Sequence, residues 1–281
     1  MNSLNPLHNK KKSIFLHYLK INIGKNKNND INTNLLKITQ IKKMSDKEER
    51  EIGRIKELES TNLAREEIRD LVIETKKEVE KENEILAERI NNEFLKNHIK
   101  SFDIVGAIGA GKTALLEKIS EAISSKYRTL AICGDITTRV DANRIEQHNV
   151  ETVQINTGRE CALNAYHINQ IIKNKDLTNY DVIFIENVGN LICPSEFTLG
   201  TDMRIIVVSI TEGEWVIEKH PMLFKMSDIA IINKIDLLER LGTNIDKMIS
   251  DAKKYNPNIE VITTSAKTGE NIEKLIKIMG L

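Results

Sequence analysis

Short apolar runs alternate with longer amphipathic stretches in the part of the chain that begins at Ser101. The runs are rich in isoleucine, valine and leucine, whereas the stretches between them repeat apolar residues at the spacing of a helix with one buried face. Strands that alternate with helices in this way predict an α/β fold, in which helices cover both faces of a mostly parallel, doubly wound sheet. The predicted strands are residues 102–105, 129–133, 152–155, 182–186, 205–209, 229–233 and 261–264.

The segment before Ser101 has a different character. Residues 44–100 are dense in glutamate and lysine, and Ile52, Ile55 and Leu58 recur at a spacing of three. This pattern predicts one long or two shorter amphipathic helices. Such helices would pack along the edge of the main domain, pair with a second subunit, or simply stabilise the fold. The predicted domains are thus a helical N-terminal segment, residues 44–100, and a main domain, residues 101–281.

Residues 1–43 form a third part, with nine lysines against one acidic residue and therefore a net charge of +8. The segment shows no sustained hydrophobic periodicity, so it lacks the apolar surface that a folded core requires. We predict that it is a disordered basic leader or a mis-annotated stretch that is not translated. A basic arm for nucleic acid is the alternative.

The whole chain carries no net charge, with 41 basic and 41 acidic residues. No overall field attracts nucleic acid or an anionic membrane, so we expect neither as a partner. Three cysteines do not make a disulfide framework in 281 residues, and no apolar run reaches the roughly 18 residues of a membrane span. These features predict a protein of the reducing cytoplasm.

A phosphate-binding loop follows the first predicted strand directly. Residues 106–113 match the spacing G-x-x-x-x-G-K-[ST] of a P-loop nucleotide hydrolase. The glycines let successive N–H groups face the β-phosphate, and the next helix adds its positive N-terminus. The lysine would bridge the β- and γ-phosphates, and the threonine hydroxyl would bind Mg²⁺. The predicted nucleotide-binding residues here are Gly106, Gly109, Ala110, Gly111, Lys112, Thr113 and Ala114.

Two later motifs predict that the base is guanine. Asn233, Lys234 and Asp236 form an N-K-x-D pattern at the end of a predicted strand. A carboxylate accepts hydrogen bonds only, so it suits the two donors on guanine N1 and N2 and opposes an acceptor on adenine. Lys234 would lie along the base, and Asn233 would tie its loop to the phosphate loop. The last predicted strand is followed by Ser265, Ala266 and Lys267, whose backbone would support the guanine O6.

The predicted catalytic residues are Lys112 and Thr113 together with two acidic residues at strand ends. Glu186 ends a fully apolar strand, where a contact to Mg²⁺ belongs, and Asp135 ends the second strand near the Mg²⁺ or the attacking water. Asp141 is a weaker candidate, because it also suits the N-cap of the next helix. No glutamine or arginine finger is evident from the spacing, so we expect slow intrinsic hydrolysis.

Two of the three cysteines lie near these motifs. Cys161 begins a predicted helix, residues 161–167, where a thiol has a lowered pKa and is a ready soft ligand. Cys193 lies seven residues after Glu186, so a loop that senses the nucleotide carries a thiol. Cys133 lies inside an apolar strand and is predicted to be a core residue. From these residues alone, metal ligands and buried structural cysteines remain alternatives for Cys161 and Cys193.

Over residues 70–281 the sequence resembles the hydrogenase nickel-incorporation GTPases of the HypB family, a nucleotide-dimerising branch of the P-loop GTPases. The resemblance implies a GTP-dependent homodimer that binds Ni²⁺ or Zn²⁺ at its interface through Cys161 and Cys193. It also implies nickel delivery to the large subunit of [NiFe]-hydrogenase with a partner nickel metallochaperone. Besides the phosphate loop, it rests on residues 134–138, 141–145, 154–158, 186–194, 211–213 and 233–238.

The sequence departs from this family at one position. The family usually has Cys-His where this chain has Cys161-Ala162, and His167, later in the predicted helix, is expected to be a surface or core histidine. Our hypothesis is that Cys193 joins Cys161 across a two-fold interface, so that four thiolates bind Zn²⁺ or Ni²⁺. The alternatives are a GTP-regulated interaction switch without metal delivery and a urease-accessory GTPase, whose Cys-Pro-His motif is absent.

Overall fold

The computed structural model describes residues 65–135, 140–158, 160–195 and 197–281. The expectations for residues 1–43 and for residues 44–64 of the helical segment lie outside these residues. The chain divides into two units, and the larger one, Thr75–Leu281, holds the sheet and its helices. Of the smaller unit, the structure describes only the beginning of helix α3.

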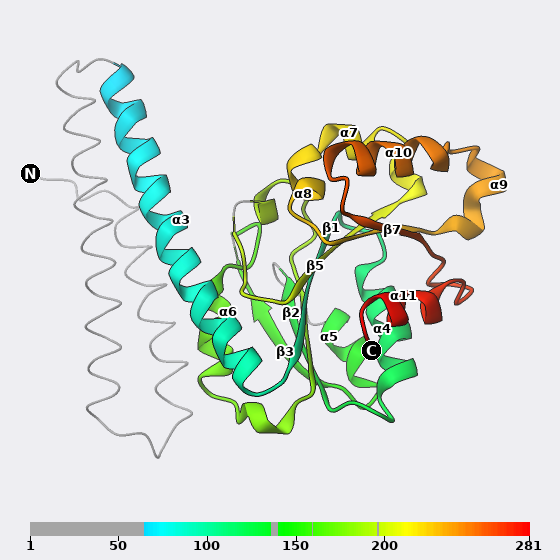
Figure 1. The fold of residues 1–281 in the computed structure, drawn as a ribbon, viewed down its shortest axis with the longest axis horizontal. Coiled ribbons are helices and arrows are strands. Elements are labelled where there is room, and N and C mark those ends of the chain that lie inside the picture. The colour runs from blue at the N-terminus through cyan, green and yellow to red at the C-terminus, as the bar shows by residue number, and fades with distance from the viewer. Residues whose placement is uncertain (1–64, 136–139, 159, 196) are drawn as a thin grey trace, which may run out of the picture. The chain divides into compact units, whose positions relative to one another are not determined.

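A seven-stranded sheet forms the centre of the larger unit, and every pair of neighbouring strands in it is parallel (Figure 1). The strand order is β3-β2-β4-β1-β5-β6-β7, so β1 lies between β4 and β5. The predicted α/β class and all seven predicted strands are confirmed. The strands are β1 (Lys100–Gly106), β2 (Thr129–Asp135), β3 (Glu151–Asn156), β4 (Val182–Glu186), β5 (Met203–Ser209), β6 (Ile229–Asn233) and β7 (Glu260–Thr263).

Helices cover both faces of the sheet because consecutive strand residues point to opposite faces. In β1, Phe102 and Ile104 pack with α4, α5 and α11, whereas Val105 packs on the other face with α7, α8 and α10. A third apolar cluster joins α6 and the C-terminal half of α3 to β2 and β4. These helices are α3 (Arg65–Lys96), α4 (Lys112–Ile123), α5 (Val140–Glu146), α6 (Ala165–Ile172), α7 (Val216–Lys219), α8 (Pro221–Lys225), α10 (Ile245–Tyr255) and α11 (Ile272–Ile278), and a short α9 (Leu238–Leu241) follows β6.

The C-terminal half of α3 is attached to the loop that precedes β5. The buried Asn83 donates to the carbonyl of Thr198 at 2.8 Å, and Asn91 donates to the carbonyl of Gly200 at 3.2 Å. Gly200 has φ +79°, and a Cβ there would lie 2.1 Å from the carbonyl oxygen of Ala87. Only glycine therefore allows the loop to approach the helix this closely.

Across the described residues, no helix combines the length and the apolar character that crossing a bilayer requires.

Replacing Gly200 with alanine tests this contact. We expect the free energy of unfolding to fall by about 2 kcal/mol or more. The new methyl group must displace backbone atoms of α3, and alanine is also strained at a positive φ. The matched control is Gly242→Ala, at φ +62° with nothing within 4 Å of the added Cβ. Denaturant titration of both variants should show the larger loss for Gly200→Ala, and equal losses would contradict the close approach.

Candidate functional site

The phosphate loop connects the end of β1 to the start of α4, as the motif predicts. The Lys112 ammonium donates to the carbonyls of Gly106 and Ala107, both at 3.1 Å. It thus lies folded over the loop, and burial lowers its pKa despite the nearby charge of Glu186. A triphosphate would supply the negative charge that this buried cation needs.

A cavity of about 380 Å³ lies beside the phosphate loop. It is lined by the loop, the start of α4, the ends of β2 and β4, and α5. The structure thus brings all four predicted catalytic residues to one place. The polar and charged residues that line the cavity are Lys112, Thr113, Asp135, Asp141, Arg144, Glu186 and Asn187.

Glu186 and Thr113 form the centre of the cavity. The Thr113 hydroxyl donates to Glu186 Oε1 at 2.7 Å, and Glu186 is only 4% exposed. Burial raises the pKa of Glu186 to about 7, although the Thr113 hydrogen bond and the charge of Lys112 oppose the rise. Its other oxygen, Oε2, is buried and has no hydrogen-bond partner among the described residues. A carboxylate oxygen left without a partner beside a threonine hydroxyl fits Mg²⁺, a hard cation that prefers oxygen ligands.

The two remaining acidic candidates come from β2 and α5. Asp135 ends β2 and lines the cavity. Asp141 lies in the first turn of α5, whose first residue is Val140. The interpretation of Asp141 as the N-cap is therefore wrong, because the helix already includes it.

The residues predicted to read the base also come together. Asn233, only 1% exposed, donates through Nδ2 to the carbonyl of Ala110 at 3.0 Å and accepts from the Ala266 N–H at 3.1 Å. Its side chain thus joins the phosphate loop to the loop after β7. Ser265 donates to Asp236 Oδ1 at 2.7 Å, which fixes the carboxylate that would accept from guanine. Lys234 adopts φ +67° between them, and Lys267 is exposed.

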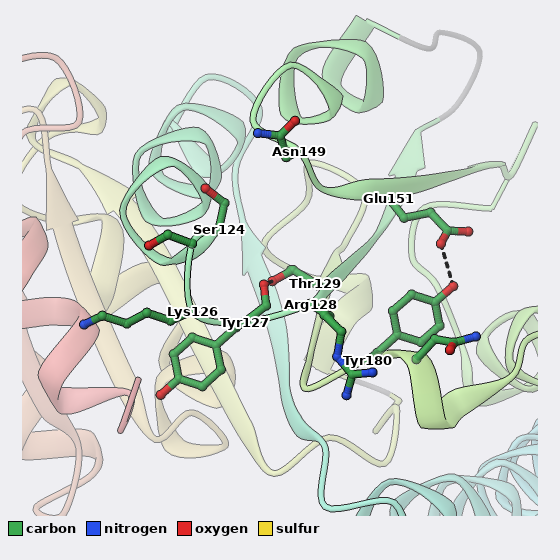
Figure 2. A pocket seen from close by; sticks show the side chains of 10 residues that line it. Ser124, Lys126, Tyr127, Arg128, Thr129, Asn149, Glu151 and Tyr180 are labelled. Carbon is green, nitrogen blue, oxygen red and sulfur yellow. Dashed lines mark hydrogen bonds between the residues drawn. The ribbon is translucent and has the colours of Figure 1, made fainter.

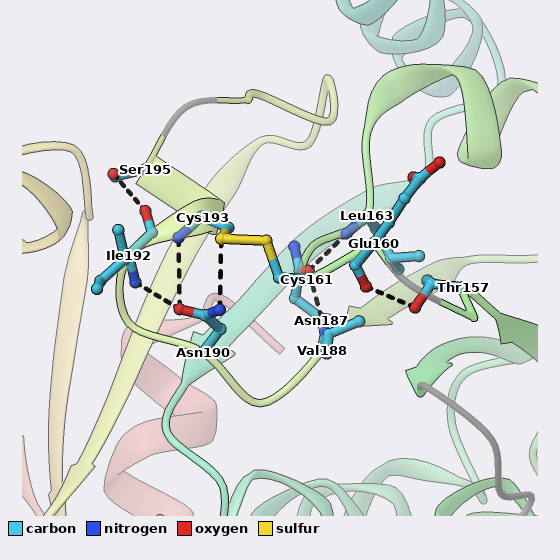
Figure 3. Close-up of a disulfide and its surroundings, with 10 residues drawn as sticks. All are labelled: Thr157, Glu160, Cys161, Leu163, Asn187, Val188, Asn190, Ile192, Cys193 and Ser195. Carbon is cyan, nitrogen blue, oxygen red and sulfur yellow. Dashed lines mark hydrogen bonds between the residues drawn. A yellow bond between two sulfur atoms is a disulfide. The ribbon is translucent and has the colours of Figure 1, made fainter.

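The two candidate metal ligands form a disulfide within one chain, with their Cα atoms 6.0 Å apart (Figure 3). Two expectations need correction here. Three cysteines were not expected to form disulfides, and Cys193 was expected to meet Cys161 across an interface; instead the fold brings them together in a single subunit. Residues 32 apart in the sequence are brought into contact by the loops that follow β3 and β4, and spacing alone cannot show that proximity.

The prediction that a helix begins at Cys161 is also wrong, because Cys161 lies before the observed helix. Helix α6 begins at Ala165, because the Asn164 side chain accepts from the His167 N–H and caps it. Cys161 therefore does not lie in the first turn of this helix, and its sulfur is bonded to Cys193. His167 is half-buried, accepts from the Asn164 N–H and lies 3.3 Å from Glu160, so it serves the cap. Within the described part of the chain, no three histidine, cysteine or acidic residues gather as a metal site would require.

The segment that carries Cys193 is bonded to the phosphate loop through Asn190, a residue to which the sequence analysis gave no role. The Asn190 N–H donates to the carbonyl of Gly106 at 3.0 Å. Its side-chain Oδ1 accepts from the Ile192 N–H at 2.7 Å, and its Nδ2 lies 3.4 Å from the Cys193 sulfur (Figure 3). Beside it, a Cβ on Gly189 would lie 3.1 Å from the Ile108 backbone. One asparagine thus touches both the phosphate loop and the thiol.

Asn187 makes a similar connection to Cys161. Its side-chain Oδ1 accepts from the Leu163 N–H at 2.9 Å, two residues after Cys161, and its Nδ2 donates to Asp103 at 3.3 Å. Asp103 in turn forms a buried ion pair with Arg204 at 2.8 Å. Burial raises the pKa of Asp103, and the charge of Arg204 opposes that rise. Both asparagines lie in the run 186–194 that carries the family resemblance, and this run was the signal that could have identified them.

A second cavity, of about 490 Å³, lies where β2, β3 and β4 begin, at the opposite ends of these strands from the phosphate loop (Figure 2). Three of its lining residues are in ion or hydrogen-bonded pairs: Arg128 pairs with Asp181 at 2.7 Å, and Tyr180 donates to Glu151 at 2.7 Å.

Comparisons with known proteins agree with this geometry. The CobW/HypB/UreG nucleotide-binding domain matches residues 101–263. The probable hydrogenase maturation factor HypB of Methanocaldococcus jannaschii is 44% identical over 209 residues, which cover 74% of this chain and 94% of that protein.

Two solved structures are also similar. HypB from Archaeoglobus fulgidus has a TM-score of 0.67 at 39% identity, over 71% of this chain and 97% of that one. HypB from Helicobacter pylori in complex with nickel has a TM-score of 0.66 at 30% identity, over 70% and 93%. The phosphate cavity, the loops predicted to read guanine and these similarities lead to one conclusion: the chain belongs to the HypB family of hydrogenase maturation GTPases.

Proposed function

We propose that this protein hydrolyses GTP and couples the nucleotide to the binding and release of nickel during maturation of [NiFe]-hydrogenase. One observation carries the coupling: Asn190 bonds to the phosphate loop and also contacts the Cys193 sulfur. The hydrogenase role and the nickel cargo are supported by the relatives, one of which was solved with nickel. The absence of the Cys-Pro-His motif disfavours the urease-accessory alternative.

The nucleotide half of the proposal follows from the cavity. Lys112 would give up its hydrogen bonds to the carbonyls of Gly106 and Ala107 and bind the β- and γ-phosphates instead. Thr113 and Glu186 would hold Mg²⁺. When bound, Mg²⁺ neutralises charge that develops on the phosphates. Asp236, fixed by Ser265, would select guanine. Asp135 would contact the Mg²⁺ or the attacking water, and slow hydrolysis by the single subunit remains our expectation.

The metal half requires the Cys161–Cys193 disulfide to be reduced, because the thiolate is the form that binds metal. Two thiolates fill only half of a four-coordinate shell, so a second copy of the chain would supply the other two. Ile108 and Ile192 support such a homodimer, because these apolar residues are 80% and 66% exposed beside the phosphate loop and Cys193. Ni²⁺ is the proposed cargo, and Zn²⁺ suits the same four thiolates.

The other proposed partners are a nickel metallochaperone and the hydrogenase large subunit, as the resemblance implies. Ala162 favours a second candidate function, an interaction switch without metal delivery. It replaces the usual histidine and is only 6% exposed, so its side chain points into the fold. Under this alternative, GTP would still close the dimer, and the disulfide would serve only to join two loops.

Metal titration separates the two functions. We expect the reduced protein, loaded with a non-hydrolysable GTP analogue, to bind one Ni²⁺ or Zn²⁺ per dimer. The double variant Cys161→Ala, Cys193→Ala should lose this site, because its thiolates provide the ligands. Cys133→Ala is the matched control, since this free thiol is buried in β2. An unchanged stoichiometry in the double variant would reject metal handling by these cysteines and favour the interaction switch.

Guanine selection is tested at Asp236. We expect Asp236→Asn to weaken GTP binding about 100-fold, because one amide cannot accept both guanine donors as the carboxylate does. The same variant should gain affinity for xanthosine triphosphate, since the new amide donates to the added oxygen of the base. Glu239→Gln on the neighbouring α9 serves as the control. Equal GTP affinities for Asp236→Asn and the wild type, measured by calorimetry, would contradict the assignment of the base site.

A further inference from the structure

We propose that Arg144 is a catalytic residue for GTP hydrolysis and that Glu117 holds it beside the phosphate cavity until the nucleotide binds. The proposal rests on the GTP hydrolysis proposed above and adds a residue to which neither the motif spacing nor the family resemblance gave a role. It rests on three observations: where Arg144 lies, what it binds, and how much of its hydrogen-bonding capacity is unused.

The position of Arg144 is set by the packing of α5. Ala142 and Ile145 on this helix are fully buried in the same apolar cluster as α4. Their burial fixes the helix, and the Arg144 side chain lines the phosphate cavity with Lys112 and Glu186. Its charge acts there as well: burial raises the pKa of Glu186, and Arg144 is among the cations that oppose the rise. Arg144 thus lies within electrostatic reach of the residue proposed to hold Mg²⁺.

The Glu117 carboxylate binds Arg144 in a bidentate pair. Arg144 Nε donates to Oε1 at 3.0 Å, and Nη2 donates to Oε2 at 2.5 Å. Glu117 lies on α4, four residues after Thr113, so the pair is about one helical turn from the phosphate loop. Planar pairs of this kind fix the direction of a guanidinium.

Among the residues that the structure describes, the pair leaves most of the guanidinium available. Of its five N–H donors, Glu117 uses two, and Nη1 lies 3.9 Å from Asp141, beyond a normal hydrogen bond. The side chain is 42% exposed, so packing does not prevent it from turning toward the cavity. A phosphate oxygen would offer the same bidentate geometry as the carboxylate that it replaces.

The chemistry of hydrolysis needs such a cation. Water attacks the γ-phosphorus, the bond to the β–γ bridging oxygen breaks, and its electron pair stays on the GDP product while the proton of the water passes to phosphate. Negative charge therefore grows on the bridging oxygen and the γ-phosphate oxygens in the transition state. Lys112 supplies one positive charge at this place. Arg144 supplies a second that binds the transition state more strongly than the ground state.

The competing interpretation is that the Arg144–Glu117 pair only holds α5 against α4. Two matched variants distinguish the roles, because each abolishes the ion pair and only one removes the cation. Arg144→Ala removes both, whereas Glu117→Gln breaks the charged pair and keeps the arginine. A structural pair predicts the same loss in both variants. A catalytic arginine predicts a loss in Arg144→Ala alone.

The experiment measures single-turnover GTP hydrolysis, and it also measures GDP affinity with and without aluminium fluoride, which mimics the transferring phosphoryl group. We expect Arg144→Ala to hydrolyse GTP at least about 100-fold more slowly and to lose the tightening of GDP by aluminium fluoride, while its affinity for GDP alone stays unchanged. Arg144→Lys, which keeps the charge without the planar fork, should be intermediate. Glu117→Gln should hydrolyse GTP at the wild-type rate or faster.

Two outcomes would overturn the assignment: wild-type hydrolysis by Arg144→Ala, or equal losses in Arg144→Ala and Glu117→Gln. The affinity for GDP alone verifies that each variant retains a folded site, and Arg144→Lys carries the test if the alanine variant does not fold. Failure of the proposed function has a different signature. A wild-type protein that binds GTP without hydrolysing it would overturn the GTPase itself, and the assignment of Arg144 with it.

Discussion

The hydrogen bond from the Asn190 N–H to the Gly106 carbonyl joins the phosphate loop to the cysteine-bearing loop, and the proposed coupling depends on it. The strand order makes this bond possible. Because β1 lies between β4 and β5 in a parallel sheet, the loops that follow β1 and β4 leave the same edge of the sheet side by side. Under the proposed coupling, a change in the phosphate loop would act on residues 187–193 directly, without a relay through the core.

The two cysteines depend on the same strand end in different ways. Cys193 is reached through Asn190, whereas the turn after Cys161 is held by Asn187, which directly follows Glu186. Asn187 also donates to Asp103. Because Asp103 is held in a buried ion pair with Arg204, this bond fixes the orientation of the Asn187 side chain. Breaking such a buried pair is costly, because it leaves a charge without a partner. Both cysteine loops are thus bonded to residues at the end of β4.

The sequence predicts the sheet well because its strands are buried on both faces. Strands such as β4 and β6 are fully buried, and each begins with four consecutive apolar residues. Such continuous apolar runs are typical of strands in a parallel sheet. The nucleotide residues are equally readable, since the phosphate loop and N-K-x-D spacing follow from the shape of the ligand. The beginning of α6 was missed because Asn164 caps it, and the apolar residues before it resemble a first helical turn.

Other features could not be predicted because they join residues far apart in the chain. The Cys161–Cys193 contact, the Arg144–Glu117 pair and the Asn187–Asp103 bond span 32, 27 and 84 residues. Only the folded sheet decides which of these side chains meet. Unlike these contacts, the replacement of the family's histidine by Ala162 can be seen in the sequence itself. The structure adds that this position faces inward, so the cysteines of two subunits would have to complete a metal site together.

The central claim is that the phosphate loop controls the thiols through Asn190, and nickel affinity measures it most directly. The dissociation constant of Ni²⁺ would be measured on the reduced protein, with a GTP analogue and with no nucleotide, for the wild type, for Asn190→Ala and for the surface control Asn174→Ala. Our account predicts that the analogue changes nickel affinity at least about fivefold in the wild type and the control, the usual lower range of coupling between two sites, and that Asn190→Ala loses this dependence while still binding GTP. Equal nucleotide dependence in the wild type and Asn190→Ala would contradict the account.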